Sequence, residues 1–251
     1  YTDNAIVVVT WMHVSTLVVM GLWYWLYVVR RQKKAGIPCA GFFTGKSFGF
    51  AVMLAFGAQL LIGLILTVWQ YAAPDMIEAY NQMMEESGIA TTGFLSIIAT
   101  VILAPIGEEI IFRGLTMEYL KKAGAGFWAA NVIQAFFFGF AHLNLVQGTY
   151  AFLLGLTCGY VVLRYRSLLA GIAVHMVFNA YGTFVTPLLN MIFGSEPSAA
   201  VEIGNYVAAI VFGAGLFAAG LILVKKDLKE KEEREEAEQS VYDGASPMLH
   251  S

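Results

Sequence analysis

The sequence predicts an all-α, polytopic transmembrane helical bundle of about seven spans. Hydrophobic residues make up 58% of the 251 residues and charged residues only 13%, which is about half the charged share of an ordinary soluble domain. The mean hydropathy is +0.66. Several apolar segments reach the length of about 20 residues that a helix needs to cross a bilayer. We therefore expect a multi-pass integral membrane protein whose surroundings are lipid, and no nucleic-acid partner.

Seven apolar segments are interpreted as spans. Between the second and the third lies a segment without Lys or Arg, residues 71–90, which we expect to form a short surface helix on the outer side. The third span contains Pro105, where we expect a bend because proline has no N–H group for the helix ladder. The predicted spans cover residues 5–29, 47–69, 91–122, 127–143, 149–163, 168–186 and 203–224.

The distribution of positive charge sets the predicted orientation. With seven crossings and the N-terminus outside, 14 of the 15 Lys and Arg residues lie on the cytoplasmic side, and the exception is Arg113. Cytoplasmic loops carry the excess of Lys and Arg in membrane proteins, so the C-terminus is predicted to be cytoplasmic. The chain then divides into a two-span region (1–90), a membrane domain with the polar motifs (91–224) and a charged tail (225–251), which we expect to be solvated and partly disordered.

The two cysteines lie on different predicted elements. Cys39 is in a basic loop and Cys158 is in the middle of the fifth span. This placement indicates neither a disulfide framework nor a thiolate metal site. We expect both side chains to be structural, since a free cysteine usually behaves as a small apolar residue.

Three charged residues interrupt the third span. Glu108, Glu109 and Arg113 follow a run of apolar residues, and each costs several kcal/mol in lipid unless it is paired or faces a wet cavity. At about 100° per residue, Glu109 lies roughly 40° from Arg113 around the helix, whereas Glu108 lies roughly 140° away. We therefore predict an ion pair between Glu109 and Arg113, with Glu108 free to face another helix.

Two later spans carry histidines at similar depths. Phe138 and His142 share a face of the fourth span, and His175 and Asn179 share a face of the sixth. From the cytoplasmic edge, Glu108, His142 and His175 lie about 20, 22 and 14 Å deep at 1.5 Å per residue. A desolvated carboxylate beside an imidazole can activate water, and a His/Asn face can stabilise an oxyanion. The pattern indicates a hydrolase. His13 of the first span is assigned to helix packing instead.

These motifs resemble those of the CAAX protease and bacteriocin-processing family, also called the Abi family of intramembrane proteases. The resemblance covers residues 91–186 and rests on Glu108-Glu109-x-x-x-Arg113, Phe138-x-x-x-His142 and His175-x-x-x-Asn179, in that order. It implies a helical bundle around an intramembrane active-site cavity that is open to the cytosol and to lipid. It also implies roles for three pairs of residues: Glu108 and His142 would activate the water, His175 and Asn179 would stabilise the oxyanion, and Glu109 and Arg113 would hold the first pair in place.

The resemblance leaves the metal open. Members of the family are commonly called metalloproteases, and Glu108, His142 and His175 could ligate zinc, yet the same residues suit a metal-free glutamate mechanism. The sequence has no HExxH motif, whose two histidines on one helical face would favour zinc. Zn²⁺ and metal-free chemistry therefore stand as equal alternatives at this point.

The predicted function is an intramembrane endopeptidase that hydrolyses a membrane-associated, hydrophobic or lipidated peptide or protein. Two alternatives remain: a non-catalytic membrane scaffold or bacteriocin-immunity protein of the same family, and an ion- or proton-coupled transporter, which also needs intramembrane Glu, Arg and His. The substrate would be a prenylated protein in a eukaryote, or a bacteriocin, a signalling peptide or a membrane regulator in a bacterium. The compact chain favours a bacterial or archaeal cell membrane.

Overall fold

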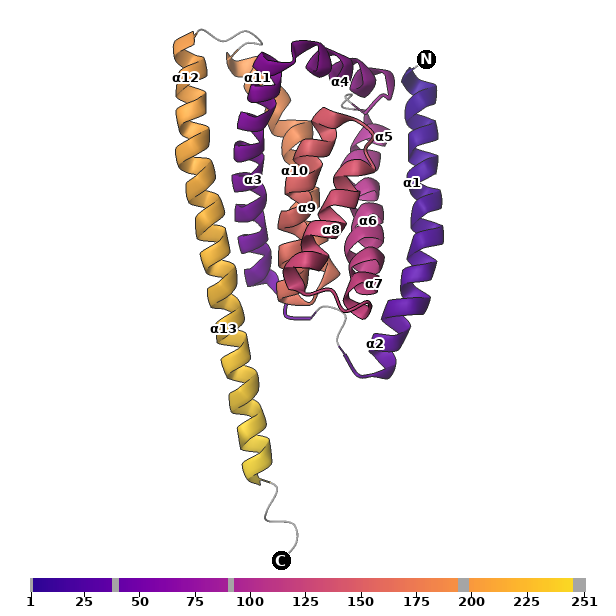
Figure 1. Ribbon diagram of the computed structural model, residues 1–251, viewed down its shortest axis with the longest axis vertical. Helices are drawn as coiled ribbons and strands as arrows, with labels where there is room; N and C mark the ends of the chain where they lie inside the picture. The colour runs from indigo at the N-terminus through magenta and orange to yellow at the C-terminus, as the bar shows by residue number, and fades with distance from the viewer. Residues whose placement is uncertain (1, 38–40, 90–92, 194–198, 246–251) are drawn as a thin grey trace, which may run out of the picture.

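In the computed structural model, the described residues are 2–37, 41–89, 93–193 and 199–245, and every regular element among them is a helix. Figure 1 shows these helices running side by side, with the two ends of the chain at opposite ends of the bundle. This arrangement agrees with an odd number of crossings. The all-helical, polytopic bundle predicted from the sequence is confirmed.

Several passes are built from more than one helix. The first pass consists of α1 (Thr2–Tyr24) and α2 (Arg30–Lys34), and the third consists of α5 (Phe94–Ile97), α6 (Ala104–Glu109) and α7 (Met117–Lys122), with π-helical turns in between. The sixth pass joins α10 (Leu168–Ala180) to α11 (Thr186–Phe193), and the seventh joins α12 (Ala199–Ala208) to α13 (Ala214–Ala245) in the same way. The remaining helices are α3 (Gly45–Ala72), α4 (Pro74–Glu86), α8 (Phe127–Phe140) and α9 (Leu145–Tyr165).

Six helical segments of the described residues are long and apolar enough to cross a membrane, and α8 is a shorter apolar helix. With 14 residues, α8 is about 21 Å long, less than the roughly 30 Å of a hydrocarbon core. The predicted fourth span reached residue 143, but the helix ends at Phe140. Leu143 has a positive φ of 52°, and the side chain of Asn144 caps the start of α9 by accepting from the Gln147 N–H at 2.9 Å. A tight turn therefore replaces the last part of the predicted span.

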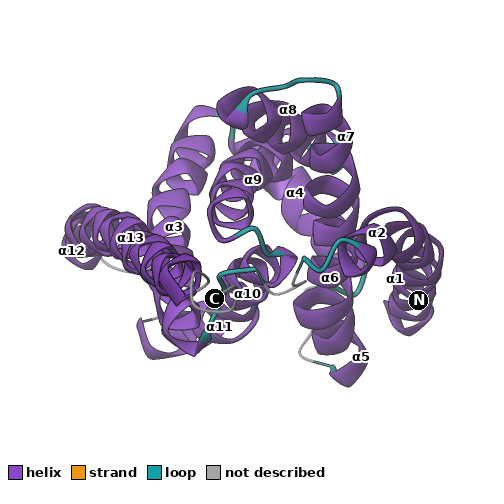
Figure 2. Ribbon diagram, turned by 90° about the horizontal axis from the view of Figure 1, so that it is seen from below, coloured by secondary structure: helices purple, strands orange, loops and turns teal. Residues whose placement is uncertain are grey.

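The middle of the bundle is occupied by α9. In the most apolar stretch of α9, 56% of the residues are buried inside the bundle, whereas in the most apolar stretch of the first pass only 6% are. Figure 2 shows α9 with α3, α8 and α10 around it, while α1 and α13 lie on opposite sides. Helices α8 and α9 approach closely at Gly139. A Cβ at this position would lie only 2.6 Å from the Gly148 carbonyl oxygen, so the close approach requires glycine. Leu54, Phe138, Leu154, Val161 and Val174 are among the buried residues of the central core.

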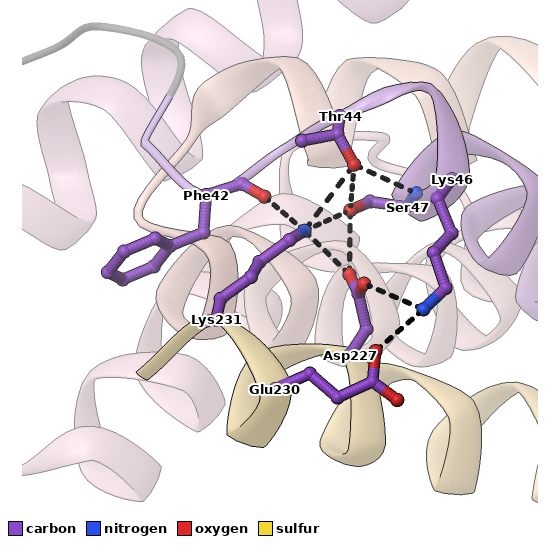
Figure 3. Close-up of polar contacts among 7 residues, drawn as sticks. All are labelled: Phe42, Thr44, Lys46, Ser47, Asp227, Glu230 and Lys231. Carbon is purple, nitrogen blue, oxygen red and sulfur yellow. Dashed lines mark hydrogen bonds and ion pairs between the residues drawn. The ribbon is translucent and has the colours of Figure 1, made fainter. Parts of the chain in front are cut away.

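Helix α13 is anchored to the start of α3 by a buried polar network (Figure 3). The carboxylate of Asp227, which is 2% exposed, accepts from Lys231 at 2.7 Å and from the Ser47 hydroxyl at 2.8 Å. Lys231 also donates to the Phe42 carbonyl at 2.6 Å. Beyond this network, α13 extends past the other helices as far as Ala245 (Figure 1). The rest of the charged tail, residues 246–251, lies outside the described residues, as do Cys39 and the polar loop at 194–198.

Replacing Asp227 by asparagine is expected to destabilise the fold by about 1–3 kcal/mol, because the donors of Lys231 and Ser47 lose a charged acceptor in a buried site. A suitable control is Glu230→Gln on the same helix, whose 2.8 Å ion pair with Lys46 is solvent-exposed and contributes little to stability. The apparent melting temperature in detergent checks the difference. Equal shifts for the two variants would show that the network does not anchor α13.

Candidate active site

The charged motif lies on a helix with widened turns on both sides. Residues Ile98–Leu103 and Ile110–Thr116 are π-helical, and α6 lies between them. Just before Pro105, the N–H of Ala104 donates to the Ala99 carbonyl, five residues back. The distortion expected near Pro105 thus takes the form of π-helical turns, which occur frequently at functional sites. These turns set the directions in which Glu108, Glu109 and Arg113 project.

Glu109 and Arg113 form the predicted ion pair inside the bundle. The distance between Glu109 Oε1 and Arg113 Nη1 is 2.7 Å, and both side chains are 0% exposed. The Arg113 guanidinium also lies over the Phe138 ring, 4.4 Å from its centroid. Pairing and the aromatic contact together offset the cost of burying the two charges.

His175 joins this pair from α10. Its Nδ1 atom is 3.0 Å from Glu109 Oε1, and its Nε2 atom is 3.6 Å from Glu108 Oε2. A carboxylate can only accept, so Nδ1 carries a proton and Nε2 points toward Glu108. The close approach of α10 requires Gly171, since a Cβ there would collide with the Glu109 carboxylate. Glu109 therefore orients His175, whereas the resemblance implied that Glu109 and Arg113 hold Glu108 and His142.

Glu108 and His142 line one cavity but are held by different contacts. Glu108 is 27% exposed, and this is the only carboxylate of the motif that lines the cavity. His142, in the turn after α8, donates from Nδ1 to the Phe138 carbonyl at 2.8 Å, which leaves its Nε2 atom free to accept. The Phe138 ring contacts both histidines, with centroid distances of 5.0 Å to His142 and 5.6 Å to His175.

Asn179 reaches the same cavity from α10, one turn beyond His175. Its side-chain N–H donates to the Thr100 carbonyl at 2.9 Å. An amide group has two N–H donors, so the second remains for a ligand. The bond to Thr100 also sets the orientation of the Asn179 amide, because a carbonyl oxygen can be contacted only by the amide N–H group and not by the amide oxygen.

The cavity has a volume of about 590 Å³ and receives side chains from the first, third, fourth, fifth and sixth passes as well as from α3 and α4. It brings together Glu108, His142, His175 and Asn179, all predicted from the sequence, while Glu109 and Arg113 lie behind them in the core. A second pocket, of about 620 Å³ between α3, α8, α9 and α13, contains none of these residues.

Two features of the cavity were missed by sequence reasoning. His13 lines it, although the sequence assigned His13 to packing; its Nδ1 atom donates to the Val9 carbonyl at 2.8 Å within α1. The hydroxyls of Tyr80 on α4 and Tyr150 on α9 are hydrogen-bonded at 3.0 Å at the α4 side of the cavity. Burial raises the pKa of Tyr80, and the bond to Tyr150 lowers it in part. The only sequence signal was the polar character of His13 within an apolar span.

The predicted zinc ligands do not gather around one point. Among the described residues, the group of ligand atoms close enough to hold a metal ion comes from Glu109, Cys158 and His175, and not from Glu108, His142 and His175. All three are at most 2% exposed, so the group offers no open position for water, which a catalytic zinc site keeps. Glu109 is also paired with Arg113, whose positive charge disfavours a second cation there. This group does not fit a catalytic zinc ion.

Fold and site together define a polytopic helical membrane protein with a buried Glu, Arg and His cluster beside an intramembrane cavity. Residues 90–181 match the family described as Type II CAAX prenyl endopeptidase Rce1-like. This match confirms the resemblance to the CAAX protease family over these residues, and at the level of the family it indicates a membrane protease. Neither the curated proteins nor the solved structures gave a match to the chain.

Proposed function

We propose that the protein is an intramembrane endopeptidase in which Glu108 activates the attacking water. The observation that carries this proposal is the cavity in which Glu108, His142, His175 and Asn179 meet from three passes of the bundle. Glu109 is neutralised by Arg113, so Glu108 is the carboxylate available for proton transfer. Its partial burial and its position next to His175 suit a general base.

The proposed reaction proceeds without a covalent intermediate. Glu108 takes a proton from water while the water oxygen bonds to the scissile carbonyl carbon. The Nε2 atom of His142 accepts a hydrogen bond from the other O–H of that water and so holds the water in line with the carbonyl carbon. The free N–H of Asn179 and the imidazole of His175, which lies between Glu108 and Glu109, stabilise the oxyanion. Glu108 then returns its proton to the leaving nitrogen as the C–N bond breaks.

We expect this activity to be independent of zinc, because the proposed steps use only protein side chains and water. Dialysis against a strong zinc chelator should leave the rate of peptide cleavage unchanged, while a zinc protease treated in parallel loses its activity. If cleavage disappears on chelation and returns with added Zn²⁺, the metal-free mechanism is wrong even though the protease assignment stands.

The proposal as a whole is tested with the detergent-purified protein and a library of quenched-fluorescent peptides with apolar C-terminal segments. Cleavage in H₂¹⁸O should place one ¹⁸O atom in the new carboxyl group, as expected for direct attack by water. A scaffold or immunity protein of this family would bind peptides without turnover, and a transporter would instead move ions across vesicle membranes. Substrates of the membrane-anchored or lipidated class are favoured by the apolar walls of the cavity, such as Ile62, Leu66 and Phe178.

A further inference from the structure

The second pocket, between α3, α8, α9 and α13, is apolar over most of its length and basic at one end. Its inner walls are aliphatic and aromatic side chains, among them Ala58, Leu153 and Phe217. Arg164 of α9 and Lys225 of α13 line it at the basic end of the bundle. No Asp or Glu is among the described residues that line it. The pocket is therefore an apolar slot that ends at two positive charges.

The two cations are available for a ligand. Arg164 and Lys225 are both exposed, and within the described part of the chain neither forms an ion pair with a carboxylate. The Arg164 guanidinium lies over the rings of Phe127 and Tyr160, 4.9 and 5.5 Å from their centroids, and these contacts hold it at the mouth of the pocket. A phosphate group, which pairs well with guanidinium and ammonium groups, complements this end.

A buried hydroxyl in the same pocket has no partner. Tyr160 lines the pocket and is 7% exposed, and its hydroxyl oxygen makes no hydrogen bond to any described residue. A buried polar group without a partner costs stability, and a ligand that supplies an acceptor removes that cost. Tyr160 lies one turn, about 6 Å, further into the bundle than Arg164. At this depth the ester oxygens of a glycerolipid follow its phosphate, and the hydroxyl can donate to one of them.

The apolar part of the pocket has the length of one leaflet. At 1.5 Å per residue, Leu153 lies about 16 Å from Arg164 along α9, and Phe217 lies about 12 Å from Lys225 along α13. Half of a hydrocarbon core of about 30 Å is about 15 Å. Trp128 of α8, which is 62% exposed, also lines the pocket, and tryptophan is enriched at the level of the headgroups. An acyl chain can lie in the slot while its headgroup stays at the basic end.

We propose that this pocket is a binding site for an anionic glycerophospholipid. The lipid comes from the leaflet at the basic end, which is predicted to be cytoplasmic. Its phosphate contacts Arg164 and Lys225, an ester oxygen accepts from the Tyr160 hydroxyl, and an acyl chain fills the slot. Basic pockets between transmembrane helices suit such headgroups. The site is distinct from the catalytic cavity, since Ile62 is the one described residue that lines both.

The proposal is tested first on the purified wild-type protein in a neutral detergent. Phosphatidylglycerol and phosphatidylcholine with the same acyl chains are titrated, and bound lipid is followed by native mass spectrometry. Phosphatidylglycerol should bind at least about tenfold more tightly, because each Lys or Arg near the headgroup contributes roughly fivefold. Glycerol 3-phosphate at the same concentration should not displace it, because this compound lacks the chain. Equal affinities for the two lipids, or displacement by glycerol 3-phosphate, overturns the proposal.

The role of the two cations is tested by a double variant. Arg164→Gln with Lys225→Gln should weaken phosphatidylglycerol binding about 10–30-fold and leave phosphatidylcholine binding unchanged. The matched control is Arg166→Gln with Lys226→Gln, which removes two exposed charges close by in the chain that do not line the pocket. The control should bind phosphatidylglycerol like the wild type. Equal losses in both double variants would show that the lipid responds to the charge of the whole basic end and not to this pocket.

Tyr160→Phe tests the contact inside the slot, because it removes only the unpaired hydroxyl. Binding of phosphatidylglycerol should weaken about 3–10-fold, the value of one hydrogen bond. The melting temperature of the lipid-free protein should not fall, since the hydroxyl has no partner among the described residues. Unchanged lipid affinity, or a lower melting temperature without lipid, contradicts the assigned contact. None of these measurements requires peptide cleavage, so the lipid site and the proposed function fail or stand independently.

Discussion

Glu108→Gln is expected to lower kcat for peptide cleavage by about 10²–10⁴-fold, the usual contribution of a positioned general base. Glutamine keeps the size of the side chain but cannot accept the proton of the attacking water. The fold should tolerate the change, since Glu108 is partly exposed and its nearest ionic contact is the 3.6 Å approach to His175. Initial rates with the preferred peptide of the library, together with the melting temperature, check both statements.

Glu118→Gln is the matched control for this variant. Glu118 follows on the same pass and forms a 3.3 Å surface pair with Lys122, so its replacement removes the same charge far from the cavity. The control should retain wild-type kcat. A Glu108→Gln protein that is folded and still cleaves at the wild-type rate would show that the intramembrane carboxylate is not the base, and the scaffold and transporter alternatives would then be favoured.

Arg113→Met is expected to destabilise the protein by about 3–5 kcal/mol, because it leaves the Glu109 carboxylate buried without its positive partner. Methionine keeps much of the apolar length of arginine and can maintain the contact with Phe138. Denaturation in detergent, compared with wild type under the same conditions, measures the effect.

The double variant Glu109→Gln with Arg113→Met separates charge from packing. Since it buries no ion, most of the stability lost in Arg113→Met should return. Activity should stay low in the double variant, because His175 no longer has a charged acceptor at Nδ1 to orient its ring. Recovery of full activity along with stability would mean that Glu109 is only a structural partner of Arg113 and does not position His175.

Local periodicity was sufficient to predict the Glu109–Arg113 pair. Residues four apart on a helix are neighbours whatever the rest of the chain does, and the 2.7 Å contact follows from that spacing. The π-helical turns around α6 were only anticipated as a bend near Pro105. They were not predictable in detail, because a single extra residue per turn leaves no signature in an apolar sequence.

Contacts between helices were not predictable from these patterns. Which histidine meets which glutamate depends on the rotation and depth of each helix. The family resemblance implied that His142 works with Glu108, and the structure places His175 between Glu108 and Glu109. His13 was assigned to packing because nothing on its own helix shows that α1 borders the cavity. The end of α8 at Phe140 likewise depends on the turn formed with α9.

The sequence by itself determined that this is a multi-pass helical membrane protein and which polar residues lie inside it, because hydropathy and charge act through the composition of each segment. Only the tertiary structure decided that these residues share one cavity, that Glu109 supports His175, and that the cavity extends toward α4. The physical reason is that lipid exposure is a property of single helices, whereas a site requires that several helices be packed at particular distances and rotations.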